Sequence, residues 1–176
     1  PDSSYHGETS EPRVLDTFYR SIERLLEAAV KYNSVVGVEA VYRQNTISTI
    51  ERMRALVEHF DTPHLRVIYD PINLVPWTGI QEADESVRLT PSDEAQRTFF
   101  ARALDAFGPK IGALHIKGYR LDEKGWKIGD LPQGEGVLNW ALLFSMLRER
   151  SIDVPGLLEN ANPLTIKKTL ARLATY

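Results

Sequence analysis

The chain contains no cysteine among its 176 residues. Without cysteine it can form neither a disulfide framework nor a site based on a thiolate. It also has no apolar run of 18 residues and no recognisable signal peptide, so no segment is typical of a transmembrane or secreted protein. We therefore expect a soluble protein of the cytoplasm.

Blocks of positive charge are missing as well. Lysine and arginine total 21 against 24 acidic residues, a net charge of −3, and the basic residues are scattered beside acids. This distribution is typical of solvated helix faces and argues against nucleic acid or a membrane surface as the main partner. The glycine spacing of a P-loop or dinucleotide site is also absent, and we interpret the GEG at 134–136 as a turn.

What the sequence does contain is an alternation of two apolar patterns. Short runs typical of buried strands lie at 35–41, 65–69, 111–116 and 156–158. Helix-type spacing covers 16–32, 47–60, 91–107, 139–149 and a terminal segment that Asn162 and Pro163 introduce. One helix followed by four strand–helix units predicts an α/β fold with a parallel sheet and right-handed crossovers. The length suits a single domain over residues 1–176.

The segments between these elements carry boundary signals. Asn45 or Thr46 is expected to cap the second helix, and Thr90 the third. Segments 71–90 and 118–137 are rich in proline or glycine and are predicted to be long loops. Both follow strands, at the edge where parallel barrels carry their sites, so we expect lids and substrate contacts there.

A potential metal ligand ends each predicted strand: Glu39, Asp70, His115 and Glu159. The carboxyl ends of the strands in a parallel barrel point into one shared site. Three carboxylates and an imidazole form a hard ligand set suited to Mn²⁺ or Mg²⁺. Each residue alone has an ordinary explanation, such as a solvated loop glutamate, an Asp-Pro turn, a core histidine or help in capping a helix. That all four predicted strands end in such a ligand is much harder to attribute to chance.

Other side chains near these strand ends are candidates for binding a substrate. Lys117 and Arg120 could hold an anionic group such as phosphate, or be exposed loop cations. Asn73 could hydrogen-bond a hydroxyl group. Trp77 and Trp126 lie in the two long segments, where aromatic rings either wall a sugar pocket or fix loops on the barrel rim.

The segments VGVEAV, VIYDPINL, GALHIKG, QGEGVLNW and GLLEN together resemble the xylose isomerase-like superfamily of sugar phosphate isomerases and epimerases. They span nearly the whole chain, and QGEGVLNW is the most specific of them. The resemblance implies a (β/α)8 TIM barrel and one divalent metal ion, Mn²⁺ first, with Mg²⁺, Co²⁺ or Zn²⁺ as alternatives. It implies that Glu39, Asp70, His115 and Glu159 hold this ion. It also implies that the two glutamates form the acid/base pair of an isomerase or epimerase acting through an enediolate.

The sequence departs from the ketose 3-epimerase pattern in three places. Asn73 replaces a substrate-binding histidine, Arg120 lies in a different local motif, and Gly118 replaces the aspartate of His-x-Lys-Asp. Two alternatives therefore stay open, a dehydratase of a keto-polyol similar to inosose dehydratase, and a non-catalytic half-barrel fragment. A nuclease of the endonuclease IV type is disfavoured, because its trinuclear zinc cluster needs more histidines near strand ends.

The chain begins with Pro1 and shows only four strands, whereas a complete barrel needs roughly 200–250 residues or more. The resemblance places these strands fifth to eighth, so we expect the C-terminal half of a longer enzyme. A half-barrel leaves a sheet edge and an inner face uncovered. The missing N-terminal half, or a second copy in a homodimer, is expected to cover them.

Overall fold

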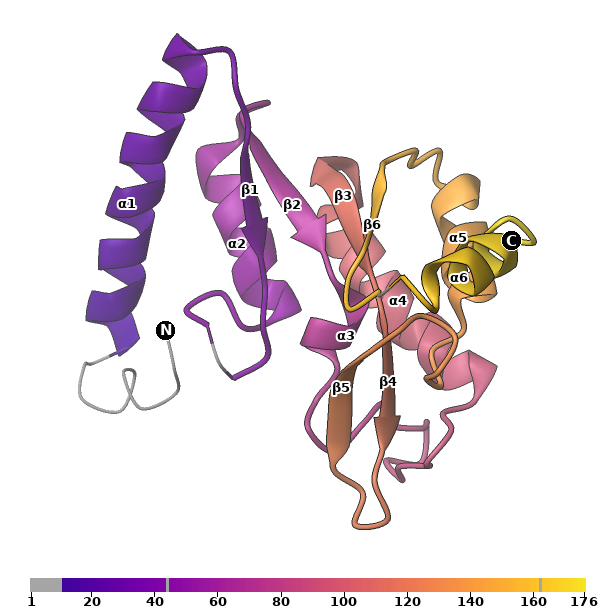
Figure 1. Ribbon diagram of the computed structural model, residues 1–176. Coiled ribbons are helices and arrows are strands. Elements are labelled where there is room, and N and C mark those ends of the chain that lie inside the picture. Colours follow the sequence, from indigo (N-terminus) through magenta and orange to yellow (C-terminus); the bar gives the residue numbers. More distant parts are fainter. Residues whose placement is uncertain (1–10, 44, 162) are drawn as a thin grey trace.

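A four-stranded parallel sheet forms the centre of the computed structural model, which describes residues 11–43, 45–161 and 163–176 (Figure 1). The strand order is β1-β2-β3-β6. The strands are β1 Val36–Glu39, β2 Leu65–Tyr69, β3 Ile111–Ile116 and β6 Gly156–Leu158. All pairings are parallel, so the carboxyl ends of the four strands lie at the same end of the sheet. The predicted α/β fold with a parallel sheet is confirmed.

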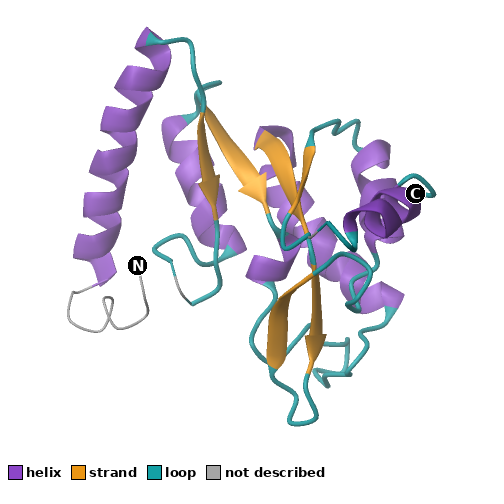
Figure 2. Ribbon diagram, viewed as in Figure 1, coloured by secondary structure: helices purple, strands orange, loops and turns teal. Residues whose placement is uncertain are grey.

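Amphipathic helices cover one face of this sheet. They are α1 Glu11–Lys31, α2 Ile50–Phe60, α4 Asp93–Phe107, α5 Trp140–Glu149 and α6 Ile166–Leu173. Helix α4 packs against both α2 and α5. In Figures 1 and 2, α2 and α4 lie behind the strands, α5 and α6 stand to the right of β6, and α1 stands to the left of β1. The core between helices and sheet includes Met53, Phe100, Leu143 and Tyr69, all fully buried. This apolar layer holds the strands, and therefore their carboxyl ends, in fixed positions.

The opposite face of the sheet is open in this chain. Gly37, Ile68 and Ala113 contribute to a groove of about 390 Å³ on it. Strands β1 and β6 are the two edge strands, and Leu157 is exposed on β6. That the N-terminal half of the barrel or a second copy covers this face stays a prediction.

The segment 71–90 is not entirely a loop, which corrects the sequence prediction. It begins with the one-turn helix α3 Pro71–Leu74. The Asp70 carboxylate caps this turn by accepting a hydrogen bond from the Asn73 N–H, 2.9 Å away. Proline suits the first helical position because it has no N–H to satisfy there.

The predicted loop 118–137 contains a β-hairpin followed by a turn. Strands β4 Gly118–Leu121 and β5 Lys127–Leu131 pair antiparallel. Oδ1 of Asp122 accepts hydrogen bonds from the backbone N–H groups of Lys124 and Trp126, and Gly125 has φ 80°. Such Asx and glycine turn chemistry favours a hairpin, so the loop assignment was wrong for a reason visible in the sequence.

Helices α2 and α4 begin later than the sequence predicts. Thr49 caps α2 and Ser92 caps α4, each by accepting a backbone hydrogen bond from the third residue on. The predicted caps are therefore wrong: Asn45, Thr46 and Thr90. Asn162, predicted to cap α6, lies outside the described residues, as does most of the opening segment. Within the described ranges, no helix combines the length and apolar character needed to cross a membrane.

Candidate metal centre

The structure brings the four predicted ligands together around the imidazole of His115. Its Nδ1 lies 3.4 Å from Oε1 of Glu39, 3.9 Å from Oδ2 of Asp70 and 3.7 Å from Oε2 of Glu159. Each side chain comes from a different strand or from the residue directly after it, and the four strands are neighbours in the sheet. The shared edge of a parallel sheet thus produces the cluster.

The Glu39 carboxylate is oriented by Asn73. The Asn73 side-chain amide donates a hydrogen bond to Oε1 of Glu39. Asn73 is itself fixed, because its N–H donates to Asp70 and its carbonyl accepts from the N–H of Tyr42 at 2.8 Å. The sequence predicts a hydroxyl-binding role for this residue; the structure places its amide on a predicted metal ligand.

Asp70 is almost inaccessible, with 1% of its surface exposed. Its two oxygens have different tasks, since Oδ1 caps α3 while Oδ2 faces His115 and Lys117. Burial raises the pKa of Asp70 to about 6, and the neighbouring Lys117 ammonium counteracts part of that rise. Asp70 therefore both caps the Asp-Pro turn and contributes a carboxylate oxygen to the cluster.

Lys117 is buried at the end of β3 and is not an exposed loop cation. Its Nζ lies 2.8 Å from Oδ2 of Asp70 and 2.7 Å from Oε2 of Glu159. Burial opposes its charge, but the two carboxylates outweigh that effect and raise the pKa of Lys117. His115 and Lys117 stand two residues apart, the period that puts side chains on one face of a strand. That spacing was the signal from which this position could have been predicted.

Glu159 is held through its backbone. Its N–H donates a hydrogen bond to the carbonyl of Ile116, 3.0 Å away, which ties the residue after β6 to the end of β3. Its side chain keeps 39% of its surface exposed, more than the other three ligands. Glu159 is thus the most accessible carboxylate of the cluster.

The donor set fits a divalent ion. The ligand atoms of Glu39, Asp70 and His115 lie within 4.8 Å of one another. Buried Nδ1 of His115 has no hydrogen-bond partner within the described chain, and the oxygens of Asp70 and Glu159 that face it also face the Lys117 ammonium. Carboxylate oxygens with one imidazole suit Mn²⁺, Mg²⁺ or Zn²⁺. A buried imidazole nitrogen that has no partner and faces three carboxylates calls for a ligand between them.

The family assignment agrees with this arrangement. Residues 3–176 match the family described as xylose isomerase-like TIM barrel. The chain belongs to this family. No curated protein sequence matches the chain.

Solved structures of this barrel family are similar in fold. 3-Keto-D-glucoside 4-epimerase from E. coli is 20% identical, with a TM-score of 0.66 over 96% of this chain and 56% of its own. The protein IOLI, crystallised with a zinc atom, is 16% identical, with a TM-score of 0.61 over 96% of this chain and 59% of its own. A xylose isomerase-like protein from Mycobacterium smegmatis, in complex with magnesium, is 18% identical, with a TM-score of 0.60 over 89% of this chain and 47% of its own. The chain thus spans about half the length of these structures.

Three further residues that the sequence singles out lie outside the cluster in this member of the xylose isomerase-like family. Arg120 is exposed on β4, and Trp77 stacks with Lys127, whose Nζ is 5.0 Å from the ring centroid. Trp126 lies in the turn of the hairpin, at the end away from β3 (Figure 1). Within the described chain, no hydrogen bond or ion pair joins these side chains to the four ligands. Their substrate-binding roles, and that of Lys117, stay predictions.

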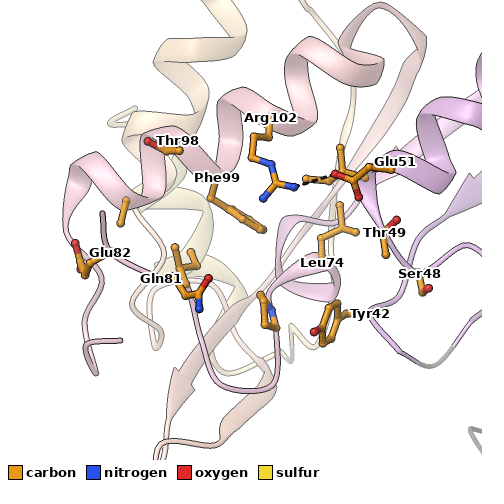
Figure 3. A pocket seen from close by; sticks show the side chains of 14 residues that line it. Tyr42, Ser48, Thr49, Glu51, Leu74, Gln81, Glu82, Thr98, Phe99 and Arg102 are labelled. Carbon is orange, nitrogen blue, oxygen red and sulfur yellow. Dashed lines mark hydrogen bonds and ion pairs between the residues drawn. The ribbon is translucent and has the colours of Figure 1, made fainter. Parts of the chain in front are cut away.

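A cavity of about 350 Å³ lies between α2 and α4 (Figure 3). Its walls include Phe99, Leu74 and Tyr42, and the ion pair of Glu51 with Arg102 crosses its upper edge. None of the four ligands lines it. The cavity is therefore separate from the candidate metal centre.

Proposed function

We propose that this chain carries the metal centre of a divalent-metal-dependent isomerase or epimerase of a sugar or sugar phosphate. The observation that carries the proposal is the convergence of three carboxylates on Nδ1 of His115 at the carboxyl ends of four adjacent strands. The similar E. coli structure is named as a sugar epimerase, which supports the reaction class. The reaction removes a proton from the carbon next to a carbonyl group and passes through an enediolate.

Glu39, Asp70, His115 and Glu159 would hold the ion. A bound divalent ion supplies Lewis acidity, which stabilises negative charge on a carbonyl oxygen and a neighbouring hydroxyl of the substrate. Mn²⁺ is the ion we propose, with Mg²⁺, Co²⁺ and Zn²⁺ as alternatives; the zinc- and magnesium-bound relatives support a metal site as such. Buried Asp70 would be the most rigid ligand, because its carboxylate is fixed on both oxygens.

The two glutamates would move the protons. Glu39 ends strand β1 and Glu159 follows β6, so they stand on the two edge strands with Asp70 and His115 between them. One carboxylate would remove the α-proton, and the other would return a proton to a different face or carbon. Their partial exposure suits this task, because a proton carrier must reach the substrate.

Proton exchange tests this function across many candidate substrates at once. The complete natural protein is incubated with Mn²⁺ and a panel of ketoses, keto-glycosides and their phosphates in D₂O, and NMR detects deuterium next to the carbonyl. We expect Glu39→Gln and Glu159→Gln to slow exchange by about 10² to 10⁴-fold. Glu58→Gln is the matched control, because Glu58 is exposed and pairs with Arg54 on the same helix.

Two results would refute the proposal. In the first, no divalent metal ion supports proton exchange. In the second, both glutamine variants exchange protons as fast as wild type. Product analysis also separates the reaction classes, because a dehydratase releases a product that lacks one hydroxyl group whereas an isomerase or epimerase conserves the substrate's formula.

A further inference from the structure

Lys117 occupies a position between two predicted metal ligands that belong to different strands. Its Nζ reaches Oδ2 of Asp70, after β2, and Oε2 of Glu159, after β6, from its own place after β3. Only 3% of its side-chain surface is exposed. The ammonium is therefore an interior component of the cluster.

The Lys117 backbone is fixed by the segment that follows the hairpin. The indole Nε1 of Trp140 donates a hydrogen bond to the carbonyl of Lys117, 3.0 Å away, and Trp140 is itself buried. The next residue, Gly118, approaches the carbonyl of Pro132 so closely that a Cβ would lie 2.9 Å from it. The QGEGVLNW segment thus holds the lysine in place.

The charges of the cluster leave room for a divalent ion. Three carboxylates contribute a formal charge of −3 and Lys117 contributes +1, which leaves −2. A divalent cation would bring the sum to zero. Burial of carboxylates is costly unless an opposite charge accompanies them, and Asp70 is the most buried of the three.

We propose that Lys117 is the internal counter-ion of this cluster: it holds Asp70 and Glu159 in place before a divalent ion binds, and it limits how tightly that ion is held. The proposal rests on the proposed function, because it assumes that the four ligands bind a metal ion. It gives Lys117 a role toward the carboxylates, in place of a contact with an anionic group of the substrate.

Loss of the ammonium should have two effects of opposite direction. The metal-free protein should become less stable, since Asp70 and Glu159 lose their counter-ion. The metal ion should bind more tightly, since a neighbouring positive charge no longer repels it. In such a variant Asn73 still binds Glu39 and Asp70, and the Ile116 carbonyl still fixes the Glu159 backbone, so only the Glu159 carboxylate loses its described partner and the ligands stay close enough to bind the ion. A merely destabilised variant would bind the ion more weakly.

The test compares Lys117→Met and Lys117→Gln with wild type in the complete natural protein. Thermal unfolding in chelator reports the metal-free stability, and calorimetric titration with Mn²⁺ alone reports affinity. We expect both variants to unfold at lower temperature without metal and to bind Mn²⁺ about tenfold more tightly. Lys110→Met is the control, because half-buried Lys110 makes an equally short ion pair, but with the exposed Asp61 and away from the cluster.

The outcomes separate this inference from the proposed function. If wild type binds none of Mn²⁺, Mg²⁺, Co²⁺ and Zn²⁺, the proposed function fails. If wild type binds Mn²⁺ and both variants bind it with equal or lower affinity, only the role of Lys117 is overturned. Variants that fold solely in the presence of Mn²⁺ support the proposal. Variants that fail to fold even with Mn²⁺ overturn it, because the ion then does not replace the ammonium.

Discussion

The side-chain amide of Asn73 donates a hydrogen bond to Oε1 of Glu39, the same oxygen that lies 3.4 Å from Nδ1 of His115. The bond joins the one-turn helix α3 to the end of β1, across 34 positions of sequence. A neutral donor thus fixes the carboxylate without removing its charge. Outer groups of this kind orient a metal ligand and adjust its affinity for the ion.

Replacing Asn73 by alanine should weaken metal binding. The Glu39 carboxylate loses its only described side-chain donor and gains rotamer freedom, so we expect about a 10-fold lower affinity for Mn²⁺ in calorimetric titration. Thr78→Ala, at an exposed residue five positions later, should bind Mn²⁺ like wild type. Unchanged affinity in Asn73→Ala would show that the hydrogen bond does not serve the metal centre.

The sequence was sufficient to predict the parallel sheet and the convergence of its strand ends. Its apolar runs gave β2, β3 and β6 their observed limits, because buried parallel strands have a simple and continuous pattern. Once the strands are parallel, Asp70 and His115 must lie at one edge of the sheet. The geometry of the ligands follows from topology more than from any local detail.

The features that the sequence did not predict depend on single side-chain hydrogen bonds. Thr90 and Ser92 are both acceptable caps, and only the contacts of Ser92 with Ala95 and Glu82 decide between them. The burial of Lys117 depends on carboxylates supplied by two other strands. Such choices between similar local options are made by tertiary contacts, which a pattern of residue types does not contain.

Glu82 should make the protein more stable at neutral than at acidic pH. Its carboxylate accepts hydrogen bonds from the side chain and the N–H of Ser92, and these lower the pKa of Glu82 below its usual 4.5. The folded state then binds the proton less readily than the unfolded state. This contribution is present above the usual pKa and is lost as the pH falls through the lowered one.

The variant Glu82→Gln tests this contribution. We expect a lower unfolding temperature than wild type at about pH 7, and a smaller difference at about pH 3, where the wild-type carboxylate is protonated as well. Glu123→Gln, at an exposed position in the hairpin turn, should show no such pattern. If the unfolding temperature of Glu82→Gln lies equally far below that of wild type at both pH values, Glu82 does not make the predicted pH-dependent contribution to stability.

Gly136 allows two backbone segments near the cluster to touch. A Cβ at this residue would lie 2.4 Å from the carbonyl oxygen and 2.5 Å from the nitrogen of Tyr119, on β4. Backbone atoms cannot move aside as a flexible side chain does, so we expect Gly136→Ala to cost about 1–3 kcal/mol in urea unfolding. Gly129→Ala is the matched control, because a Cβ there meets no atom within 4 Å. Similar losses in both variants would exclude steric contact as the cause.

Trp140 should matter through its indole N–H more than through its bulk. Phenylalanine keeps an aromatic ring beside Phe144, whose ring centroid is 5.7 Å away, but it cannot donate a hydrogen bond to the Lys117 carbonyl. That carbonyl would be left without its donor in a buried place, so Trp140→Phe should lower the free energy of unfolding by about 1–3 kcal/mol.

The same substitution at Trp126 provides the comparison, because Trp126 lies in the hairpin turn and keeps 54% of its surface exposed, whereas Trp140 is buried. We expect Trp126→Phe to change the free energy of unfolding by no more than about 0.5 kcal/mol. Urea unfolding followed by circular dichroism measures both variants without relying on tryptophan fluorescence. Should Trp140→Phe be as stable as Trp126→Phe, the indole bond is not what fixes Lys117, and the lysine must be held by its ion pairs alone.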